Sequence, residues 1–409
     1  MTTTLLFDLD GTLLSNPMQS FVPGYMKALS SYMAPIVDPD TFFQALMVST
    51  QRMLRNQDPD CYLKDVFDAS FYPMLGIPQG TIMPALERFY AQVFPTLKSL
   101  TSPMPEAVRV VEAAFKRNDT LAIATNPLFP LTAIEQRLDW AGLSPEEYPF
   151  SIVPSYENAH FAKPNPAFLA ELLARLGWPE GPVVMVGDDP DNDVRCGLEL
   201  GLPVYHVNAP PGEINPAAGV VGSGSLDDLL GWIAAQPAET LEPRFSSPTA
   251  LLAILRSTPA ALHAACQNLA PALWAQRRQP EEWCQTEILC HLRDVEAEVT
   301  VPRLARVIQE SNPFIAGQDT DPWADQRGYI QQSGSMALAG FSAARKQLID
   351  LLVQLSPRDW QRPARHAIFG PTSLQELISI IAGHDRLHIR QLFAFIQAAS
   401  ADHESSFPQ

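Results

Sequence analysis

Apolar residues follow two alternating patterns over the first half of the chain. Short β-rich apolar runs predict buried strands, and between them apolar positions recur at helical spacing. The predicted strands are Thr4–Leu9, Leu121–Thr125, Ser151–Pro154, Val183–Val186 and Val204–Val207. The helical patterns lie near Glu106–Arg117, Leu131–Ala141, Pro166–Leu176, Asn192–Leu200 and Leu226–Ala234. Strands that alternate with helices predict a parallel sheet covered on both faces.

Residues of about 16–95 interrupt this alternation. They are helical in pattern, rich in Met and Phe, and contain no clear strand. We interpret them as a helical insertion directly after the first strand. Residues 1–15 and 96–236 then form one α/β core.

Beyond residue 236 the pattern changes. Gln236–Thr249 is rich in Pro, Ser and Thr, which predicts a linker over residues 237–248. Residues 249–400 are then helical, in segments near 249–274, 281–310, 323–355 and 372–399. An up-and-down four-helix bundle is the economical packing of such segments. The expected fold class is therefore an α/β Rossmann-like parallel sheet with an inserted helical cap, followed by an all-α four-helix bundle.

Composition and charge exclude several classes of protein. Residues 1–240 carry 13 Lys and Arg against 28 Asp and Glu, a net charge of −15, and residues 241–409 carry 15 against 17, a net charge of −2. An acidic half and no basic stripe argue against nucleic-acid binding. Without a run of ~18 apolar residues we expect no membrane span, and the N-terminus lacks a signal-peptide pattern. The 5 scattered cysteines suit reduced thiols in the cytoplasm.

Residues that carry chemistry follow the predicted strands. The first strand runs into Phe7-Asp8-Leu9-Asp10-Gly11-Thr12, where two neighbouring carboxylates repel each other unless a cation such as Mg²⁺ neutralises them. Later strand ends supply Thr125-Asn126-Pro127, then Lys163, and then the acidic run Asp188–Asp193. Each motif alone is explained by an ordinary turn or a solvated charge. Together they predict one ligand site, because the carboxyl ends of parallel strands share an edge.

With these four motifs in this order, the first ~235 residues resemble the haloacid dehalogenase superfamily, specifically its phosphatases with a small helical cap. The resemblance implies that Asp8 is the nucleophile and forms an aspartyl-phosphate. It implies that Asp10 protonates the leaving oxygen and then activates water. Thr125, Asn126 and Lys163 would bind the phosphoryl group.

The same resemblance implies a Mg²⁺ site. Asp8, the backbone carbonyl of Asp10, and Asp188 would hold the ion, and either Asp193 or Asp189 would support it. Phosphoryl transfer depends mainly on positioning and charge neutralisation, which such a site supplies.

The substrate is expected to be a small phosphorylated metabolite. An acid at Asp10 favours phosphate esters, because the dehalogenase and phosphonatase branches lack it. A phosphomutase stays the alternative, since such enzymes share all four motifs. The cap would select the substrate and exclude water. Its cationic side chains are candidate contacts, or ordinary surface charges: Arg52, Arg55 and Lys64.

Three histidines of the second half are candidates for a metal site. His384 and His388 are four residues apart on the last predicted helix, so they share a face, which continues apolar residues directed at the bundle core. His291 lies on a different helix. Three imidazoles from two helices suit Zn²⁺ or Ni²⁺ and leave a position for water. From the residues alone, an ordinary helix pair and a hydrogen-bonded core histidine remain the alternative.

Residues ~249–400 resemble the DinB-like family of helical bundles. The resemblance rests on Trp283–Ile288, which leads into His291, and on His384-x-x-x-His388 followed by Arg390-Gln391-Leu392. It implies that the three histidines bind metal. The family includes thiol transferases and hydrolases, so the reaction stays open. A structural, ligand-binding or dimerisation module, with pairing into a homodimer, is the alternative. Carboxylates that could orient the imidazoles are Glu287, Asp294 and Asp385.

Overall fold

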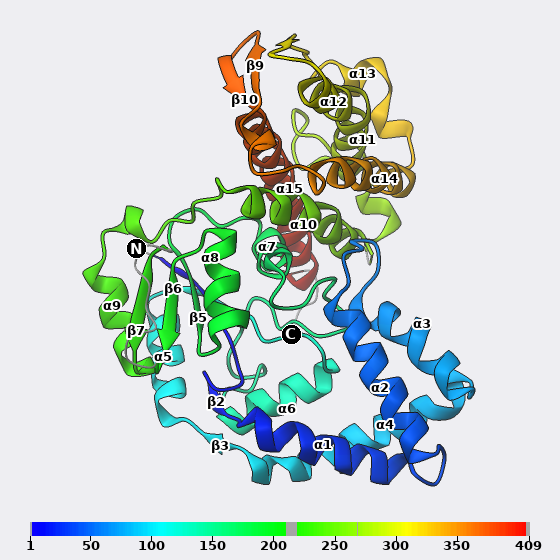
Figure 1. The fold of residues 1–409 in the computed structure, drawn as a ribbon, viewed down its shortest axis with the longest axis vertical. Helices are drawn as coiled ribbons and strands as arrows, with labels where there is room; N and C mark the ends of the chain where they lie inside the picture. The colour runs from blue at the N-terminus through cyan, green and yellow to red at the C-terminus, as the bar shows by residue number, and fades with distance from the viewer. Residues whose placement is uncertain (1, 210–218, 268, 406–409) are drawn as a thin grey trace. The chain divides into compact units, whose positions relative to one another are not determined.

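A parallel sheet forms the centre of the first half of the protein (Figure 1). The computed structural model describes residues 2–209, 219–267 and 269–405. In these residues the sheet has five strands, in the order β4 (Thr120–Ile123), β1 (Thr4–Phe7), β5 (Val183–Gly187), β6 (Val204–Val207) and β7 (Val221–Gly224). All residues of β1, β5 and β6 are buried, which explains their unbroken apolar sequence.

The register aligns the carboxyl ends of β1, β4 and β5. Thr4 lies opposite Thr120 and Val183, and Phe7 lies opposite Ile123 and Val186. The chain therefore leaves β1, β4 and β5 at the same edge of the sheet. Ligands bind at this edge in open α/β sheets.

One strand prediction was wrong, and one strand was not predicted. Ser151–Pro154 forms no strand and makes two backbone hydrogen bonds along β4, from Ser151 N to Leu121 O (2.8 Å) and from Ile123 N to Ile152 O (2.9 Å). Pro154 has no N–H with which to extend this pairing. The fifth strand of the sheet is β7. The sequence pattern did not predict it, because two of its four residues are glycine.

The helices of the first unit form two sets. One set follows the strands along the chain: α5 (Pro105–Lys116), α6 (Leu131–Ala141), α7 (Pro166–Arg175), α8 (Cys196–Leu200) and α9 (Leu229–Ala235). The other set lies between Ser15 and Ser102, and Figure 1 shows it gathered to one side of the sheet: α1 (Met18–Met33), α2 (Pro39–Leu54), α3 (Leu63–Leu75) and α4 (Gln79–Gln92). The short antiparallel strands β2 (Leu14–Ser15) and β3 (Ser102–Pro103) join the two ends of this insertion.

The second unit is a helical bundle with a small sheet. Its described helices are α10 (Pro248–Cys266), α11 (Gln285–Val295), α12 (Val301–Gln309), α13 (Trp323–Gln326), α14 (Gly334–Leu352) and α15 (Leu374–Ser405). A π-helical turn, Glu296–Thr300, joins α11 to α12. The sheet has the order β10 (Gly370–Ser373), β9 (Pro363–His366) and β8 (Phe314–Ile315).

The bundle differs from its sequence prediction in length and in this sheet. The first predicted helix ends at Cys266 rather than 274, and the third begins at Gly334 rather than 323. The sequence pattern did not predict β10, which lies within Phe369–Ser373. Strands of two to four residues that contain Pro363, Gly370 and Pro371 leave almost no strand pattern.

Contacts divide the chain into two compact units, Met1–Leu172 with Pro179–Arg244, and Leu173–Trp178 with Phe245–Gln409. The predicted fold class, a parallel α/β sheet with inserted helices followed by a helical bundle, is confirmed. In the described parts of both units, no helix has the length and apolar character required to cross a membrane.

One buried arginine connects the main segments of the bundle. Arg345 of α14 is 0% exposed. Its guanidinium donates to Glu296 of the π-helical turn (2.5 and 3.2 Å), to Asp385 of α15 (2.5 and 3.0 Å) and to the carbonyl of Leu255 in α10 (3.1 Å). Both carboxylates are buried as well. One cation with buried partners therefore holds the four segments in register.

We expect Arg345→Ala to destabilise the bundle by about 3–5 kcal/mol, because it leaves Glu296 and Asp385 buried without a counter-charge. Urea denaturation followed by far-UV circular dichroism measures the loss. The matched control is Arg306→Ala, which breaks a pair with Glu310 whose side chains are 51% and 48% exposed, and should cost less than about 1 kcal/mol. Equal losses in the two variants would contradict this account of the bundle.

Candidate active site and metal centre

A buried lysine and two carboxylates form the centre of the first site. Asp8 directly follows β1, and its backbone N–H donates to Val186 O (2.8 Å). Lys163, which precedes α7, donates from Nζ to Asp8 Oδ1 (2.8 Å) and to Asp193 Oδ1 (2.5 Å). Lys163 and Asp193 are each 1% exposed. One ammonium thus connects residues from three separate segments of the chain.

Asp188 completes a group of three carboxylates. One oxygen each from Asp8, Asp188 and Asp193 lie within 4.8 Å of one another. Thr12 Oγ1 donates to Asp188 Oδ1 (3.2 Å), and His206 Nε2 donates to the backbone carbonyl of Asp188 (2.9 Å). These contacts fix Asp188 at the end of β5, beside the end of β1.

The charges of this group are not balanced by protein alone. Burial and the neighbouring Asp193 raise the pKa of Asp8 well above its ordinary value, against the opposing effect of Lys163. Burial and Asp193 also raise the pKa of Asp188 to about 6. Burial alone would lower the pKa of Lys163, but Asp193 and Asp8 raise it above its usual range. Three carboxylates and one ammonium leave an excess of negative charge, which suits a hard divalent cation.

Two glycines leave room for these carboxylates. Gly11 has φ +94°, and a Cβ there would lie 2.3 Å from Asp188 Oδ2. A Cβ on Gly187 would lie 2.2 Å from Asp193 Oδ2. Any larger residue at either position would displace a carboxylate of the group.

Of the two acids proposed to support the metal, Asp193 and Asp189, the first faces the group. Asp193 lies in a π-helical turn, Pro190–Arg195, and its Oδ2 accepts from Asp189 N (3.0 Å). The Asp189 side chain instead caps this turn, accepting from the backbone N–H groups of Asp191 (2.9 Å) and Asn192 (2.7 Å). Asp189 therefore holds the loop in shape.

The other predicted site residues, Thr125, Asn126 and Asp10, also follow strands at this edge of the sheet. Thr125 is buried and follows β4, where Ala124 N donates to Phe7 O (2.6 Å). Asn126 Nδ2 donates to the backbone carbonyl of Lys163 (3.4 Å), which ties this loop to the lysine loop. The side chain of Asp10 lies outside the three-carboxylate group. This agrees with the expectation that Asp10 would contribute its backbone carbonyl, not its side chain, to a Mg²⁺ site.

Asp10 is held by two partners that the sequence did not indicate. Its Oδ1 accepts from Asn16 Nδ2 (2.8 Å), and its Oδ2 accepts from Arg137 Nη1. Arg137 lies in α6 and is only 1% exposed. The one available signal was its position on the buried face of that helix, together with Ile134 and Leu138.

The second site is a cluster of three imidazoles in the bundle. His291 Nε2 of α11 lies 3.1 Å from His384 Nε2 of α15, which lies 3.1 Å from His388 Nε2. His388 Nδ1 donates to Gln391 Oε1 (2.8 Å), so its Nε2 has a free lone pair. Trp283 stacks against His388, with an interplanar angle of 9°.

Burial keeps these imidazoles neutral. Together with the neighbouring His384, it lowers the pKa of His291 to about 4 and that of His388 to about 3. Burial also lowers the pKa of His384. Neutral imidazoles with converging Nε2 atoms are the ligand set that Zn²⁺ or Ni²⁺ requires.

The carboxylates suggested as orienting groups for this cluster all bind arginines. Glu287 pairs with Arg277 (2.5 Å) and also accepts from Cys284 N (2.9 Å). Asp294 accepts from the side chains of Arg293, Arg327 and Tyr329, and Asp385 pairs with Arg345. These contacts assign the three carboxylates to the framework of the bundle.

Comparison with known proteins gives a match for each unit. Residues 2–201 match the model of haloacid dehalogenase-like hydrolases, and residues 254–392 match the model of the DinB superfamily. Solved structures that the comparison finds include a phosphatase of the first family from Thermococcus onnurineus (19% identity, TM-score 0.38, covering 57% of this chain and 99% of that one). YfiT from Bacillus subtilis resembles the bundle (18% identity, TM-score 0.36, covering 39% and 93%).

Curated relatives divide in the same way. The protein named "Putative metal-dependent hydrolase OB0782" of Oceanobacillus iheyensis is 30% identical over 110 residues, 27% of this chain and 63% of the relative. Pyrimidine 5'-nucleotidase YjjG of Escherichia coli is 30% identical over 139 residues, 33% of this chain and 59% of the relative. The match thus spans about three fifths of each of these two relatives.

A third relative aligns over most of its length. Phosphoglycolate phosphatase of Rhodospirillum rubrum is 28% identical over 239 residues, 57% of this chain and 92% of the relative. Taken with the two family models, these matches agree with the division of the structure. The chain carries a haloacid dehalogenase-like hydrolase domain in its first half and a DinB superfamily domain in its second half.

Proposed function

We propose that the first unit is a Mg²⁺-dependent phosphohydrolase that acts on a small phosphorylated metabolite through an aspartyl-phosphate on Asp8. The observation that carries the proposal is the contact of Lys163 with both Asp8 and Asp193, beside Asp188, at the carboxyl edge of a parallel sheet. A buried carboxylate at that edge, with an ammonium against it, is suited to attack a phosphoryl group.

In the first step Asp8 attacks phosphorus, and the bond between phosphorus and the ester oxygen breaks. Lys163 offsets the charge shared between Asp8 and the phosphoryl oxygens, while Thr125 and Asn126 orient those oxygens. Asp10 gives a proton to the leaving oxygen and, in the second step, takes one from the water that attacks the aspartyl-phosphate. A Mg²⁺ ion held by Asp8, Asp188, Asp193 and the Asp10 carbonyl would supply charge neutralisation.

Relatives support a phosphate ester as the substrate. Two of them are named as phosphate-releasing enzymes, a pyrimidine 5'-nucleotidase and a phosphoglycolate phosphatase. Asp10 supports the same class, because a proton donor beside the nucleophile assists the departure of an alkoxide. A phosphomutase would isomerise its substrate without releasing phosphate, so phosphate release separates the two.

For the second unit we propose a divalent metal site, Zn²⁺ or Ni²⁺, on His291, His384 and His388. Their convergent Nε2 atoms support it, as does the relative named as a metal-dependent hydrolase. Three protein ligands leave an open position for water or substrate. A purely structural or dimerising bundle is the competing proposal, and metal content distinguishes the two.

Asp8→Asn should reduce Mg²⁺-dependent phosphate release from p-nitrophenyl phosphate by at least about 10³-fold, because an amide does not replace the carboxylate nucleophile. Steady-state kinetics on the full chain measures the loss. Asp191→Asn is the matched control, since that side chain lies in the same acidic loop but is 75% exposed. It should keep its rate within about twofold. Unchanged turnover by Asp8→Asn would refute the assignment.

Zn²⁺ affinity of the bundle should fall less than about tenfold between about pH 7.5 and about pH 5.5. The reason is that the pKa values of His291 and His388 are lowered to about 4 and about 3, so protons do not compete in this window. Three histidines with ordinary pKa values near 6.5 would lose roughly 10³-fold. Competition with a metal-binding dye measures the affinity at each pH.

The variant that removes His291, His384 and His388 together should hold no Zn²⁺ after reconstitution and dialysis, while His263→Ala, on α10, should hold as much as the unchanged protein. Metal content is read by mass spectrometry of the digested protein. Equal and negligible Zn²⁺ in all three proteins would favour the structural bundle.

A further inference from the structure

A cavity of about 460 Å³ lies in the first unit, between the inserted helices and the segments that follow β4. It is lined from α1, α2, α3 and α4 on one side, and by Leu128, Phe129 and Pro130 on the other. Well-packed interiors contain few voids larger than a water molecule, whereas ligand pockets measure about 300–1,000 Å³. Its volume is therefore that of a binding site.

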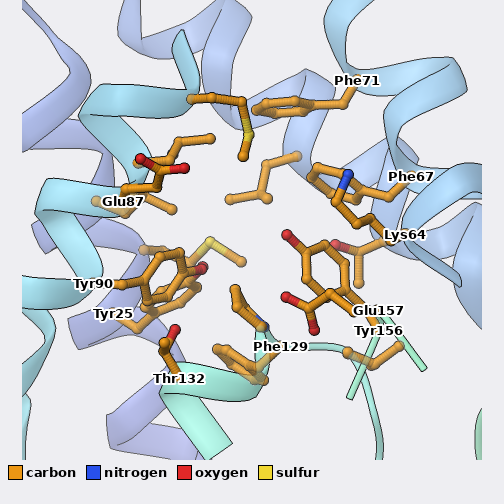
Figure 2. A pocket seen from close by; sticks show the side chains of 18 of the residues that line it. Tyr25, Lys64, Phe67, Phe71, Glu87, Tyr90, Phe129, Thr132, Tyr156 and Glu157 are labelled. Carbon is orange, nitrogen blue, oxygen red and sulfur yellow. The ribbon is translucent and has the colours of Figure 1, made fainter. Parts of the chain in front are cut away.

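The wall of this cavity is aromatic. Figure 2 shows Tyr25 and Tyr90 on one side, Phe67 and Tyr156 on the other, and Phe71 and Phe129 at the two ends. Rings of this kind bind flat apolar groups through offset and edge-to-face packing. Two rings of the wall already pack edge to face: the ring centroids of Tyr25 and Phe129 are 5.1 Å apart, with an interplanar angle of 62°.

Several polar groups of the wall already have hydrogen-bond or ion-pair partners. Lys64 pairs with Asp68, Glu157 accepts from Leu131 N (3.0 Å), and the hydroxyls of Tyr25 and Tyr90 share a hydrogen bond (2.8 Å). A small polar acid placed here would lose its water without gaining matching partners, which is unfavourable. An apolar group would lose nothing by leaving water.

The aromatic wall connects directly to Asp10. The guanidinium of Arg137 lies over the Phe129 ring, with its central carbon 4.7 Å from the ring centroid, and the same guanidinium donates to Asp10. Phe129 itself follows Thr125 by four residues. Within the described chain, the buried Nη2 of Arg137 has no hydrogen-bond partner. The cavity thus begins one side chain from Asp10, the group proposed to protonate the leaving oxygen.

We propose that this cavity holds the leaving group of the substrate and that the leaving group carries an aromatic ring. The inference rests on the proposed phosphohydrolase function and narrows its substrate class to phosphate monoesters of alcohols that bear such a ring. The ring packs between the walls formed by α1, α3 and α4. Asp8 bonds to phosphorus, the ester bond breaks, and the ring-bearing alcohol takes its proton from Asp10.

A matched pair of esters tests the proposal on the full chain with Mg²⁺. 3-Phenylpropyl phosphate and propyl phosphate are both primary alkyl esters of similar intrinsic reactivity, and they differ in the ring. Burial of a phenyl group should raise kcat/KM for the phenylpropyl ester about thirtyfold over the propyl ester. 2-Phosphoglycolate should be turned over no better than propyl phosphate.

A variant that fills the cavity provides the second arm. Leu86→Trp, on α4, should reduce the thirtyfold ratio to below about threefold, and Phe67→Ala, which removes a wall ring, should also reduce it. Met47→Trp is the control, since Met47 is 44% exposed and lies outside the cavity lining. It should keep the ratio of the unchanged protein. Using both a larger and a smaller side chain protects the test against one variant that fails to fold.

The possible outcomes separate the two claims. If p-nitrophenyl phosphate and both alkyl esters are hydrolysed but the ratio is near one, the aromatic leaving group is wrong and the phosphohydrolase stands. The same follows if the ratio persists in both Leu86→Trp and Phe67→Ala. If no ester releases phosphate, the proposed function fails, and this inference fails with it.

Discussion

The first unit depends on the two hydrogen bonds that one buried ammonium makes. Lys163 donates to Asp8 at the end of β1 and to Asp193 after β5, and both carboxylates are buried beside Asp188. Without this cation, burial and mutual repulsion would drive the carboxylates toward protonation. The arrangement is costly for stability, and such costs are characteristic of sites that bind charged ligands. The glycines at positions 11 and 187 leave room for this group, since a side chain at either one would displace a carboxylate.

The bundle also contains a buried cation paired with carboxylates, and there the ion pairs hold helices together. Arg345 is enclosed by Glu296, Asp385 and a backbone carbonyl, so its contacts reach α10, α15 and the π-helical turn after α11. Asp385 adjoins His384 along α15, so the ion pair that fixes the helix also fixes the direction of its histidine face. Buried ion pairs are poor sources of stability but strong constraints on geometry. We infer that the arginine sets the register in which His291 meets His384 and His388.

Much of this architecture was accessible from the sequence. The strand ends at Asp8, Thr125 and Asp188 could be placed at one edge because parallel strands end together, and the His384 and His388 spacing fixes a shared helix face. Arg137 could not be identified, because its partner Asp10 is 127 residues away and a lone arginine in a helix usually denotes surface. The cavity could not be predicted either, since its shape depends on how rings from four helices and two loops pack. The sequence shows how many aromatic residues there are, but their packing around one cavity depends on tertiary structure.

The central claim is that Asp8 becomes phosphorylated in a site completed by Lys163, Asp188 and Asp193. Acid quenching of the full chain during turnover of p-nitrophenyl phosphate, followed by peptide mass spectrometry, tests it most directly, because acyl phosphates survive brief acid treatment. The account predicts one phosphoryl group on the peptide that contains Asp8, present only with Mg²⁺. A phosphoryl group on another residue, or continued turnover with none on Asp8, would contradict it.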